Sequence, residues 1–205
     1  MVKWLIPDQL IDYKYAIEFM ETKVQEIYNN SSDELVWLLQ HPPLYTAGIS
    51  AIDDEIVEEL FPVHKTGRGG KYTYHGPGQR IIYLMLNLKK RNKCDIKLYI
   101  RNLSNWIISV LRHFNIFGKF KEDRIGVWVT KNGVEEKIAA FGIRLRKWVT
   151  YHGIALNVSP DLSHYKGIIP CGLKDYGITS MKKLGVEAPL PELDDILKKE
   201  FYKIF

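Results

Sequence analysis

A cysteine in an irregular stretch of chain is the first feature of this sequence that could do chemistry. Cys171 lies in IIPCGLKDYGITS, residues 168–180, between Pro170 and Gly172. A structural cysteine usually sits in a strand or on the apolar face of a helix, where it acts as a small hydrophobic side chain. The flanking proline and glycine predict irregular backbone instead, which can present the thiol to another molecule. Cys171 is therefore a candidate nucleophile.

The densest cluster of glycines is in GRGGKYTYHGPGQ, residues 67–79. Glycine allows positive φ and a close approach of backbone to a ligand, and N–H groups in such loops can hold an anion or a developing oxyanion. The segment matches neither the phosphate-binding loop G-x-x-x-x-G-K-[ST] nor the dinucleotide-binding pattern G-x-G-x-x-G. Two tight hairpin turns would explain its composition equally well, so ligand contact is one of two open interpretations.

A lysine and the histidines are the remaining candidates. Lys137, in EEKIAAFG, begins an apolar strand, where a lysine is ordinarily solvated at the strand edge. His75 can be a ligand, a base or a hydrogen-bonded structural residue. His152 and His164 precede Cys171, but neither has a context that identifies a cysteine–histidine pair. None of the six histidines has a metal-ligand spacing such as H-E-x-x-H, which predicts no metal site. They are His41, His64, His75, His113, His152 and His164.

Length and composition indicate an ordinary globular chain. With 205 residues, 46% hydrophobic and 26% charged, the sequence predicts a single domain over residues 1–205 with a sizeable core. The first apolar run stops at Pro7 and Asp8, so no signal-peptide pattern is present, and no apolar run approaches the roughly 18 residues of a membrane span. Two cysteines do not form a disulfide framework, and Cys94 resembles an incidental surface or helix-entry thiol. We expect a cytoplasmic protein.

The net charge of +5 and the pI near 9.0 predict acidic partners. Lysine and arginine cluster in LKKRNK, IRLRK and MKK. These clusters lack the interleaved aromatic residues of a single-strand-binding surface, and no zinc-finger or helix-turn-helix spacing occurs. A solvated basic face explains each cluster taken singly, and an acidic carrier protein as substrate fits the net charge as well as nucleic acid does.

Apolar periodicity predicts the elements that must position these residues. Three amphipathic helices are expected over residues 8–29, with Asp8 as N-cap, over about 100–114, and over 190–205. Strands come in consecutive runs, which favours an α+β fold with a mixed, mainly antiparallel sheet. A hairpin is predicted at Asn132-Gly133. The expected strands are VKWLI, ELVWLLQ, PVHKTG, KYTYH, RIIYLMLNL, IGVWVTKNG and one or two within EEKIAAFGIRLRKWVTYHGIALNV.

Three segments read together resemble a known family. RGGKYTYHGPGQ, KIAAFGIRLRKWVTYHGIALNV and PCGLKDYGITSM are similar to the three characteristic blocks of the LipB family, the octanoyl-[acyl-carrier-protein]:protein N-octanoyltransferases of lipoate assembly. The blocks occur in the family's order, and HPPLYTAG matches an earlier family element. The resemblance runs from about residue 3 to 190. Its most specific feature is a cysteine in P-C-G at position 171 that follows a lysine in K-I-A at position 137. The Thr-Gly before Arg68 and the basic Arg80 are small departures.

The resemblance implies the fold of biotin and lipoate protein ligases, an α+β domain with a mixed, mainly antiparallel sheet flanked by helices. It implies that Cys171 carries the acyl group and that Lys137 lowers the pKa of this thiol. An apolar slot for the acyl chain would be walled by residues such as Ile81, Tyr83 and Ile154. The residues that the resemblance places against the substrate are Arg68, Gly69, Gly70, Lys71, Tyr72, Thr73, Tyr74, His75, Ala140, Phe141, Gly142, Gly153, Ile154 and Ala155.

The implied reaction is the first step of endogenous protein lipoylation. It moves an octanoyl group from octanoyl-acyl carrier protein to the acceptor lysine of lipoyl domains, in 2-oxoacid dehydrogenase acyltransferase subunits and the glycine-cleavage H protein. Because the donor is a thioester, the resemblance implies no ATP, no other cofactor and no metal. The expected partners are octanoyl-acyl carrier protein and the lipoyl-domain proteins, both expected to be acidic, and neither nucleic acid nor a membrane is expected.

Two alternatives remain at this stage. An ATP-dependent lipoate or biotin ligase of the same fold makes an acyl-adenylate and needs no cysteine, so PCGL counts against it. A catalytically inert module that binds nucleic acid or a carrier protein is suggested only by the pI. Transfer without ATP separates the first alternative from an octanoyltransferase, and formation of an acyl-enzyme separates the second.

Overall fold

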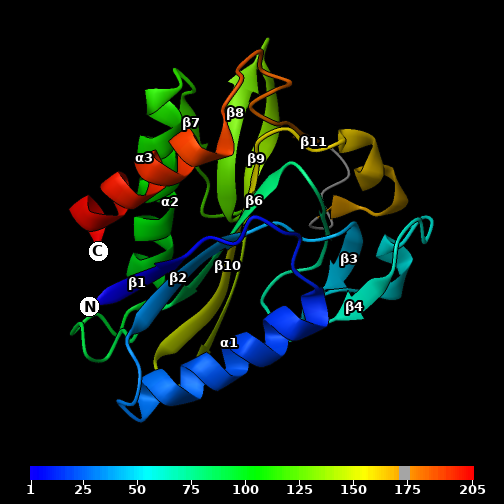
Figure 1. The fold of residues 1–205 in the computed structure, drawn as a ribbon. Helices are drawn as coiled ribbons and strands as arrows, with labels where there is room; N and C mark the ends of the chain where they lie inside the picture. The colour runs from blue at the N-terminus through cyan, green and yellow to red at the C-terminus, as the bar shows by residue number, and fades with distance from the viewer. Residues whose placement is uncertain (171–175) are drawn as a thin grey trace.

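The computed structural model describes residues 1–170 and 176–205, and its main feature is an eight-stranded mixed sheet. The strand order is β1-β2-β6-β10-β9-β8-β7, with β11 paired to β9 (Figure 1). Among the described pairs of this sheet, β1–β2 and β9–β11 are parallel and the others are antiparallel, as predicted. The strands are β1 (Val2–Leu5), β2 (Glu34–Leu39), β6 (Gln79–Met85), β7 (Gly118–Phe120), β8 (Gly126–Lys131), β9 (Val134–Arg146), β10 (Val149–Asn157) and β11 (Gly177–Ile178).

A second, three-stranded sheet lies beside the main one (Figure 1). Its order is β4-β3-β5, and two short 3₁₀ helices, η1 and η2, accompany it. The strand β3 was not expected, because it follows two prolines and is only four residues long, too short to show a period. The elements are β3 (Leu44–Ala47), η1 (Asp53–Glu55), β4 (Val63–Lys65), β5 (Tyr72–His75) and η2 (Leu162–Gly167).

The three expected helices are all present and cover both faces of the main sheet. Helix α1 (Tyr13–Tyr28) packs on one face, and α2 (Ile96–His113) and α3 (Leu190–Ile204) pack on the other (Figure 1). Strand β2 shows the consequence: Trp37 packs in the core beneath α1, whereas Leu38 packs in the core beneath α2 and α3. A strand that is buried on both faces has a continuous apolar sequence, which explains ELVWLL. None of the helices in the described chain is long and apolar enough to cross a membrane.

The prediction that Asp8 caps the first helix is wrong. The helix begins at Tyr13, and Asp12 is its N-cap, with the carboxylate accepting a hydrogen bond from the Tyr15 backbone N–H at 3.0 Å. The N–H of Ile11 donates to the Gln40 carbonyl at 2.9 Å. This long-range hydrogen bond ties the segment before Asp12 to the end of β2, so the helix begins four residues later than the apolar pattern indicates.

Two hairpins shape the long sheet. Asn132 and Gly133 have φ of 52° and 78°, which confirms the predicted turn between β8 and β9. Lys147 and Trp148 join β9 to β10 with φ of 51° and 65°, without a glycine, so sequence could not divide this region into two strands. Cys94 is exposed just before Asp95, the N-cap of α2, as expected.

A buried ion pair fastens α3 to the sheet. The guanidinium of Arg80 in β6 donates two hydrogen bonds to the carboxylate of Asp194 in α3, one from Nε at 2.8 Å and one from Nη2. The two side chains are only 5% and 8% exposed. The indole of Trp106 adds a hydrogen bond to the Leu197 carbonyl at 2.9 Å. Bidentate geometry makes this pair strong, but it also commits a charge to the interior.

Removing one member of this pair should therefore lower the free energy of unfolding far more than removing both members. We expect Asp194→Ala to lower the free energy of unfolding by about 3–5 kcal/mol, because it leaves the Arg80 guanidinium buried and unpaired. The double variant Arg80→Met/Asp194→Leu should recover most of that loss, since no charge remains to be buried. Urea unfolding followed by circular dichroism measures both. Glu122→Ala, which breaks the exposed Arg101–Glu122 pair, is the control and should change little. Equal losses in the single and double variants would contradict this account.

Candidate active site

A cavity of about 800 Å³ lies along β9. Nearly all the described residues that the sequence analysis predicts to contact the substrate line this cavity. Every described candidate except Tyr74 lines it. The predicted walls of the acyl slot, Ile81, Tyr83 and Ile154, line it as well. The lining candidates are Lys137, Arg68, Gly69, Gly70, Lys71, Tyr72, Thr73, His75, Ala140, Phe141, Gly142, Gly153, Ile154 and Ala155.

Tyr74 lies elsewhere, in the core of the small sheet. Its ring packs against Tyr45 and Phe61, with ring centroids 6.2 and 5.6 Å away, and its hydroxyl is hydrogen-bonded to His164 Nδ1 at 2.8 Å. Thr73 and His75 on either side of it line the cavity, whereas Tyr74 belongs to the hydrophobic cluster of the small sheet. Tyr74 supports the wall rather than lining it.

Lys137 is buried near the beginning of β9, with 3% of its surface exposed, rather than solvated at an edge. Its backbone is held on both sides, by register with Trp128 of β8 and with Ile178 of β11, and its carbonyl accepts from Thr179 N–H at 3.0 Å. The ammonium lies 4.8 Å from the centre of the Trp128 ring, whose face attracts a cation. Gly126, at φ +147°, leaves room for the lysine stem, because a Cβ there would lie 3.2 Å from Lys137 Cε.

Cys171 lies outside the described residues, but the chain on either side of it is anchored near Lys137. On one side, Ile169 N–H donates to the Glu55 carbonyl at 2.7 Å. On the other side, Gly177 and Ile178 form β11, which pairs with β9 at Glu136 and Lys137. The side chain of Glu55 also forms an ion pair with Lys71 of the glycine-rich segment. The described flanks of the cysteine segment thus contact the same wall as Lys137 and the glycine-rich segment.

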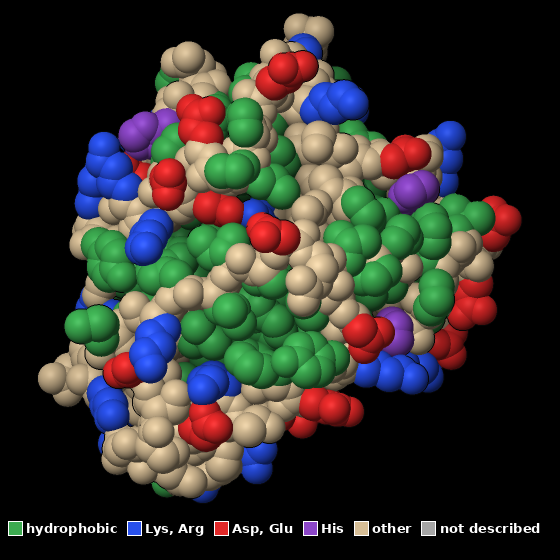
Figure 2. Space-filling view, in the orientation of Figure 1, with side chains coloured by type: hydrophobic (Ala, Val, Ile, Leu, Met, Phe, Trp, Pro, Cys, Tyr) green, Lys and Arg blue, Asp and Glu red, His purple; other side chains and the backbone are tan. Residues whose placement is uncertain are grey.

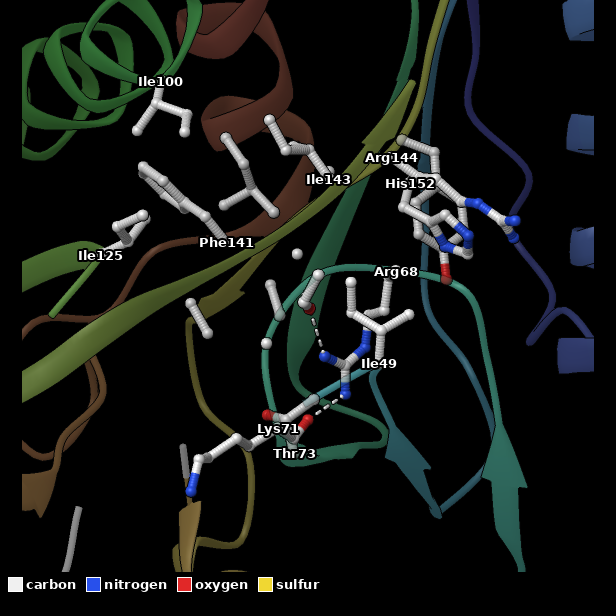
Figure 3. A pocket seen from close by; sticks show the side chains of 18 of the residues that line it. Ile49, Arg68, Lys71, Thr73, Ile100, Ile125, Phe141, Ile143, Arg144 and His152 are labelled. Carbon is white, nitrogen blue, oxygen red and sulfur yellow. Dashed lines mark hydrogen bonds between the residues drawn. The ribbon is translucent and has the colours of Figure 1, made fainter. Parts of the chain in front are cut away.

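The glycine-rich segment is held by the guanidinium of Arg68. This group donates to the carbonyl and hydroxyl oxygens of Thr46, each at 2.7 Å. It also donates to the Lys71 carbonyl at 2.7 Å and to the Gly69 carbonyl at 2.9 Å (Figure 3). Gly69 N–H in turn donates to the Ile143 carbonyl of β9 at 3.1 Å. The segment is therefore a loop docked against a strand edge, not a pair of tight hairpin turns.

Close approach explains why glycine is needed opposite this loop. A Cβ at position 142 would lie 2.8 Å from Arg68 Cδ, and a Cβ at position 153 would lie 2.0 Å from the Ile82 carbonyl oxygen. Contacts under 3.0 Å are not tolerated without a shift of the neighbour. Gly142 thus lets the loop approach the sheet surface, whereas Gly153 is required by the close approach of the Ile82 carbonyl of β6.

The two sides of the cavity differ in polarity. Ile100, Ile125, Phe141 and Ile143 converge on one side of the strand, whereas Arg68, Lys71, Thr73, Arg144 and His152 lie on the other (Figure 3). Many of these were missed from sequence, because they come from elements distant in the chain and carry no local motif. The missed lining residues include Tyr13, Ile49, Ile96, Ile100, Glu122, Asp123, Arg124, Ile125, Ile143, Arg144, Leu145 and His152.

Three buried histidines near the polar side are neutral. His41 Nδ1 is 2.6 Å from the Ile11 carbonyl and must donate to it, so Nε2 accepts from the Tyr83 hydroxyl at 2.8 Å. Burial lowers the pKa of His41 to about 4. Burial, with Arg68 and Arg144 nearby, lowers the pKa of His152 to about 3, and burial also places the pKa of His75 well below its usual value. No three histidine, cysteine or acidic side chains within residues 1–170 and 176–205 are grouped to hold a metal ion.

These neutral histidines should make the protein sensitive to acid. A histidine whose pKa is lower in the folded than in the unfolded chain stabilises the fold above pH 6.5 and loses that contribution as pH falls toward the folded pKa. For His41 the window is pH 6.5 to about 4, and the contribution lost is about 3 kcal/mol. We expect the unfolding free energies of the parent and of His41→Gln, measured in urea, to converge as pH is lowered from 7.5 to 4.5. A difference that stays constant over this range would contradict the burial of a neutral His41.

Comparisons with known proteins identify the family of the chain. Residues 12–202 match the family model described as the lipoyl protein ligase A/B catalytic domain. The chain is 83% identical over 205 residues to an octanoyltransferase of Wolbachia sp. subsp. Brugia malayi and 58% identical over 206 residues to one of Ehrlichia chaffeensis, covering 100% and 96% of those proteins.

Solved structures share the fold at low identity. A bi-partite lipoate protein ligase from Thermoplasma acidophilum superimposes with a TM-score of 0.73 at 15% identity, over 100% of this chain and 84% of that one. The biotin protein ligase from Aquifex aeolicus superimposes with a TM-score of 0.52 at 16% identity, over 98% and 67%. These likenesses confirm the expected ligase-type α+β fold. At this sequence identity they support no conclusion about activity.

Proposed function

The chain belongs to the lipoyl protein ligase A/B catalytic domain family, and on this premise we propose that it transfers octanoyl groups through a thioester on Cys171, with Lys137 as the acid and base. It is an acyltransferase like its octanoyltransferase relatives, to which it is 54–83% identical over essentially the full length. The observation that best supports these roles is the burial of Lys137 in the wall of the cavity that the glycine-rich loop also lines, beside the strand that follows the cysteine segment.

The first half-reaction loads the enzyme. A free cysteine has a pKa near 8.5, so only a few per cent is thiolate at neutral pH, and a nearby ammonium raises that fraction. In our proposal the Cys171 thiolate attacks the carbonyl carbon of the octanoyl thioester. The tetrahedral intermediate collapses, the bond to the carrier's sulfur breaks, and the departing thiolate takes a proton from the Lys137 ammonium.

The second half-reaction unloads the enzyme onto the acceptor. The neutral Lys137 amine now takes a proton from the attacking lysine of the lipoyl domain, as the new C–N bond forms. The bond from the acyl carbon to Cys171 breaks and restores the thiolate beside an ammonium. Thioester exchange is close to isoenergetic, whereas the amide product is much more stable, so the second step pulls the transfer forward without ATP.

The cavity gives the acyl chain a place to bind. Each buried CH₂ contributes roughly 0.8 kcal/mol, so a slot that covers most of an eight-carbon chain supplies much of the affinity. On the glycine-rich side, small residues leave the sheet surface open: Ala140, Gly142, Gly153 and Ala155 all line the cavity. Backbone N–H groups of the docked loop are the candidates for holding the oxyanion of each tetrahedral intermediate.

The protein partners follow from the reaction. An octanoyltransferase needs an acyl donor and a lysine acceptor, and we assign these to octanoyl-acyl carrier protein and to lipoyl domains. Figure 2 shows lysine, arginine and acidic side chains interspersed around hydrophobic side chains on this face, with no continuous basic patch. The net charge of +5 therefore acts as a diffuse attraction for acidic carriers on this side of the molecule.

The ATP-dependent ligase alternative has less support. The lipoate ligases of known structure are only 14–16% identical to this chain, which supports a shared fold but not a shared activity. The octanoyltransferase relatives match at more than three times that identity. Transfer from an acyl thioester in the absence of ATP separates the two activities.

The nucleophile can be identified directly. Incubation with octanoyl-acyl carrier protein and no acceptor should add one octanoyl group to the protein, on the peptide that contains Cys171, as read by intact mass and peptide mapping. Cys171→Ser should lose transfer at least about a hundredfold, because an unactivated hydroxyl is far less ionised than a thiol. The control is Cys94→Ser, at the exposed cysteine, which should transfer normally. Full transfer by the Cys171 variant would exclude the covalent mechanism.

The two roles of Lys137 can be separated by charge and by proton release. Lys137→Arg keeps a cation beside the thiol but cannot release its proton, because arginine stays protonated above pH 12. We expect it to form the octanoyl-enzyme and then stall before the amide, whereas Lys137→Met should be slowed about 10²–10⁴-fold at both steps. Single-turnover mass spectrometry measures each step, and iodoacetamide trapping of Cys171 as a function of pH measures thiolate. Native turnover by Lys137→Arg would show that Lys137 is not the base.

A further inference from the structure

Arg124 lies in a corner between two aromatic rings in the wall of the cavity. Its guanidinium carbon is 4.0 Å from the centre of the Tyr176 ring and 4.9 Å from the centre of the Trp128 ring. The two rings meet edge to face, with centroids 5.4 Å apart and planes at 71°. A planar guanidinium stacks well in such a corner, because an aromatic face attracts a cation. Arg124 lines the cavity, yet its side chain is only 10% exposed.

Hydrogen bonds account for only part of what holds this guanidinium. Nη2 donates to Glu135 Oε2 at 2.5 Å, and Nε lies 3.3 Å from Asp123 Oδ2 without the alignment of a hydrogen bond. Nε and Nη1 are both buried and make no hydrogen bond with any residue that the structure describes. A buried cation with unpaired donors depends on its remaining contacts, so the position of Arg124 rests on Glu135 and on the two rings.

Trp128 places this cluster beside Lys137. The two residues oppose each other in the register of β8 and β9, and the Lys137 ammonium lies 4.8 Å from the centre of the indole ring. The indole N–H donates to the Arg124 carbonyl at 2.8 Å, which fixes the orientation of the ring. One indole ring is therefore in contact with both the proposed base and the arginine.

Tyr176 belongs to the chain that follows Cys171. It stands five positions after the cysteine and immediately before β11, which pairs with β9 at Glu136 and Lys137. At this point β8 and β11 lie on opposite sides of β9 (Figure 1). The ring of Tyr176 therefore reaches across β9 to a ring of β8 and to the arginine that precedes β8.

The contact across β9 matters because β11 is very short. Its two residues are fewer than those of an ordinary strand, so its backbone pairing alone holds the segment weakly. The ring of Tyr176 adds a second attachment directly beside this pairing. Because the chain is covalently continuous, fixing Tyr176 restricts the positions that are open to a residue five places earlier.

We propose that Arg124 is a positioning residue for the nucleophile Cys171. Arg124, Trp128 and Tyr176 form a clamp that holds the chain after the cysteine against β9. This inference rests on the proposed roles of Cys171 and Lys137 in octanoyl transfer. Arg124 acts through the two rings and not on the reacting atoms. When the clamp is loosened, the thiol spends less time beside the Lys137 ammonium, so a smaller fraction of it is thiolate at neutral pH.

The test measures two properties of full-length variants. One is kcat and KM for transfer from octanoyl-pantetheine to a lipoyl domain, and the other is the pH midpoint of iodoacetamide alkylation of Cys171, read by peptide mapping. Tyr176→Ala removes one ring, whereas Arg124→Lys keeps a cation near Glu135 but loses the planar group that stacks. We expect each variant to lower kcat about tenfold with KM changed less than about twofold, and to move the alkylation midpoint about one pH unit toward 8.5, the pKa of free cysteine. Tyr176→Phe keeps the ring and should retain the parent values.

The matched control is Tyr28→Ala, which removes an equally exposed ring from another cation. Tyr28 is 41% exposed, and the centre of its ring lies 4.1 Å from the ammonium of Lys147, outside the cavity lining. Tyr176 is 38% exposed, and its ring lies 4.0 Å from Arg124. Tyr28→Ala should leave kcat and the alkylation midpoint unchanged. A double-mutant cycle gives a second check: because Arg124→Lys and Tyr176→Ala break the same contact, the double variant should be no slower than the slower single variant.

Each contrary outcome has one meaning. Parent values in Tyr176→Ala would show that no clamp positions the cysteine. Effects that multiply in the double variant would show that Arg124 and Tyr176 act separately, which also overturns the clamp. A lower kcat with an unmoved alkylation midpoint would place Arg124 on the substrate instead of the nucleophile, and the clamp would be wrong. If the parent enzyme forms no octanoyl thioester on Cys171, the proposed function fails, whereas the alkylation profile, which needs no acyl donor, still decides the clamp.

Discussion

The architecture of the site depends on how β9 is paired along its length. Between Val134 and Ala140 the strand is bonded to β8, and near Lys137 it also pairs with β11. From Phe141 to Arg146 its only partner among the described strands is β10. A strand paired on both sides is rigid and buried, whereas an unpaired edge exposes backbone groups that need other partners. One strand thus supplies a fixed lysine at one end and an open edge for a ligand-binding loop at the other.

The open edge is satisfied by the glycine-rich loop, and the loop is organised by Arg68. A buried guanidinium must have its donors paired, and Arg68 pairs them with Thr46 and with carbonyls of the loop itself. This draws the loop around the side chain and leaves Gly69 N–H free to bond Ile143. The space that remains between loop and sheet is the cavity.

The polar side of this cavity contains more hydrogen-bonding capacity than the fold alone needs. His41 is fully satisfied by Ile11 and Tyr83, as a structural histidine should be. The ring of His152 lies 6.1 Å from that of Tyr83, without a hydrogen-bond partner for its imidazole among the described residues and in a strained backbone conformation. Buried polar groups without a protein hydrogen-bond partner are rare in native proteins, and most of them bind a ligand or an ordered water molecule.

The sequence by itself determined the three helices, most strands, the Asn132-Gly133 turn and the α+β class, because apolar periodicity and turn chemistry are local properties. Its three motif blocks also identified a large part of the cavity lining, although they wrongly included Tyr74 and gave no sign of lining residues such as Ile49, Ile100 and Ile125. Only the tertiary structure decided the start of α1 at Tyr13, the burial of Lys137 and the position of His152. These depend on hydrogen bonds and packing between segments far apart in the chain, which no local pattern records.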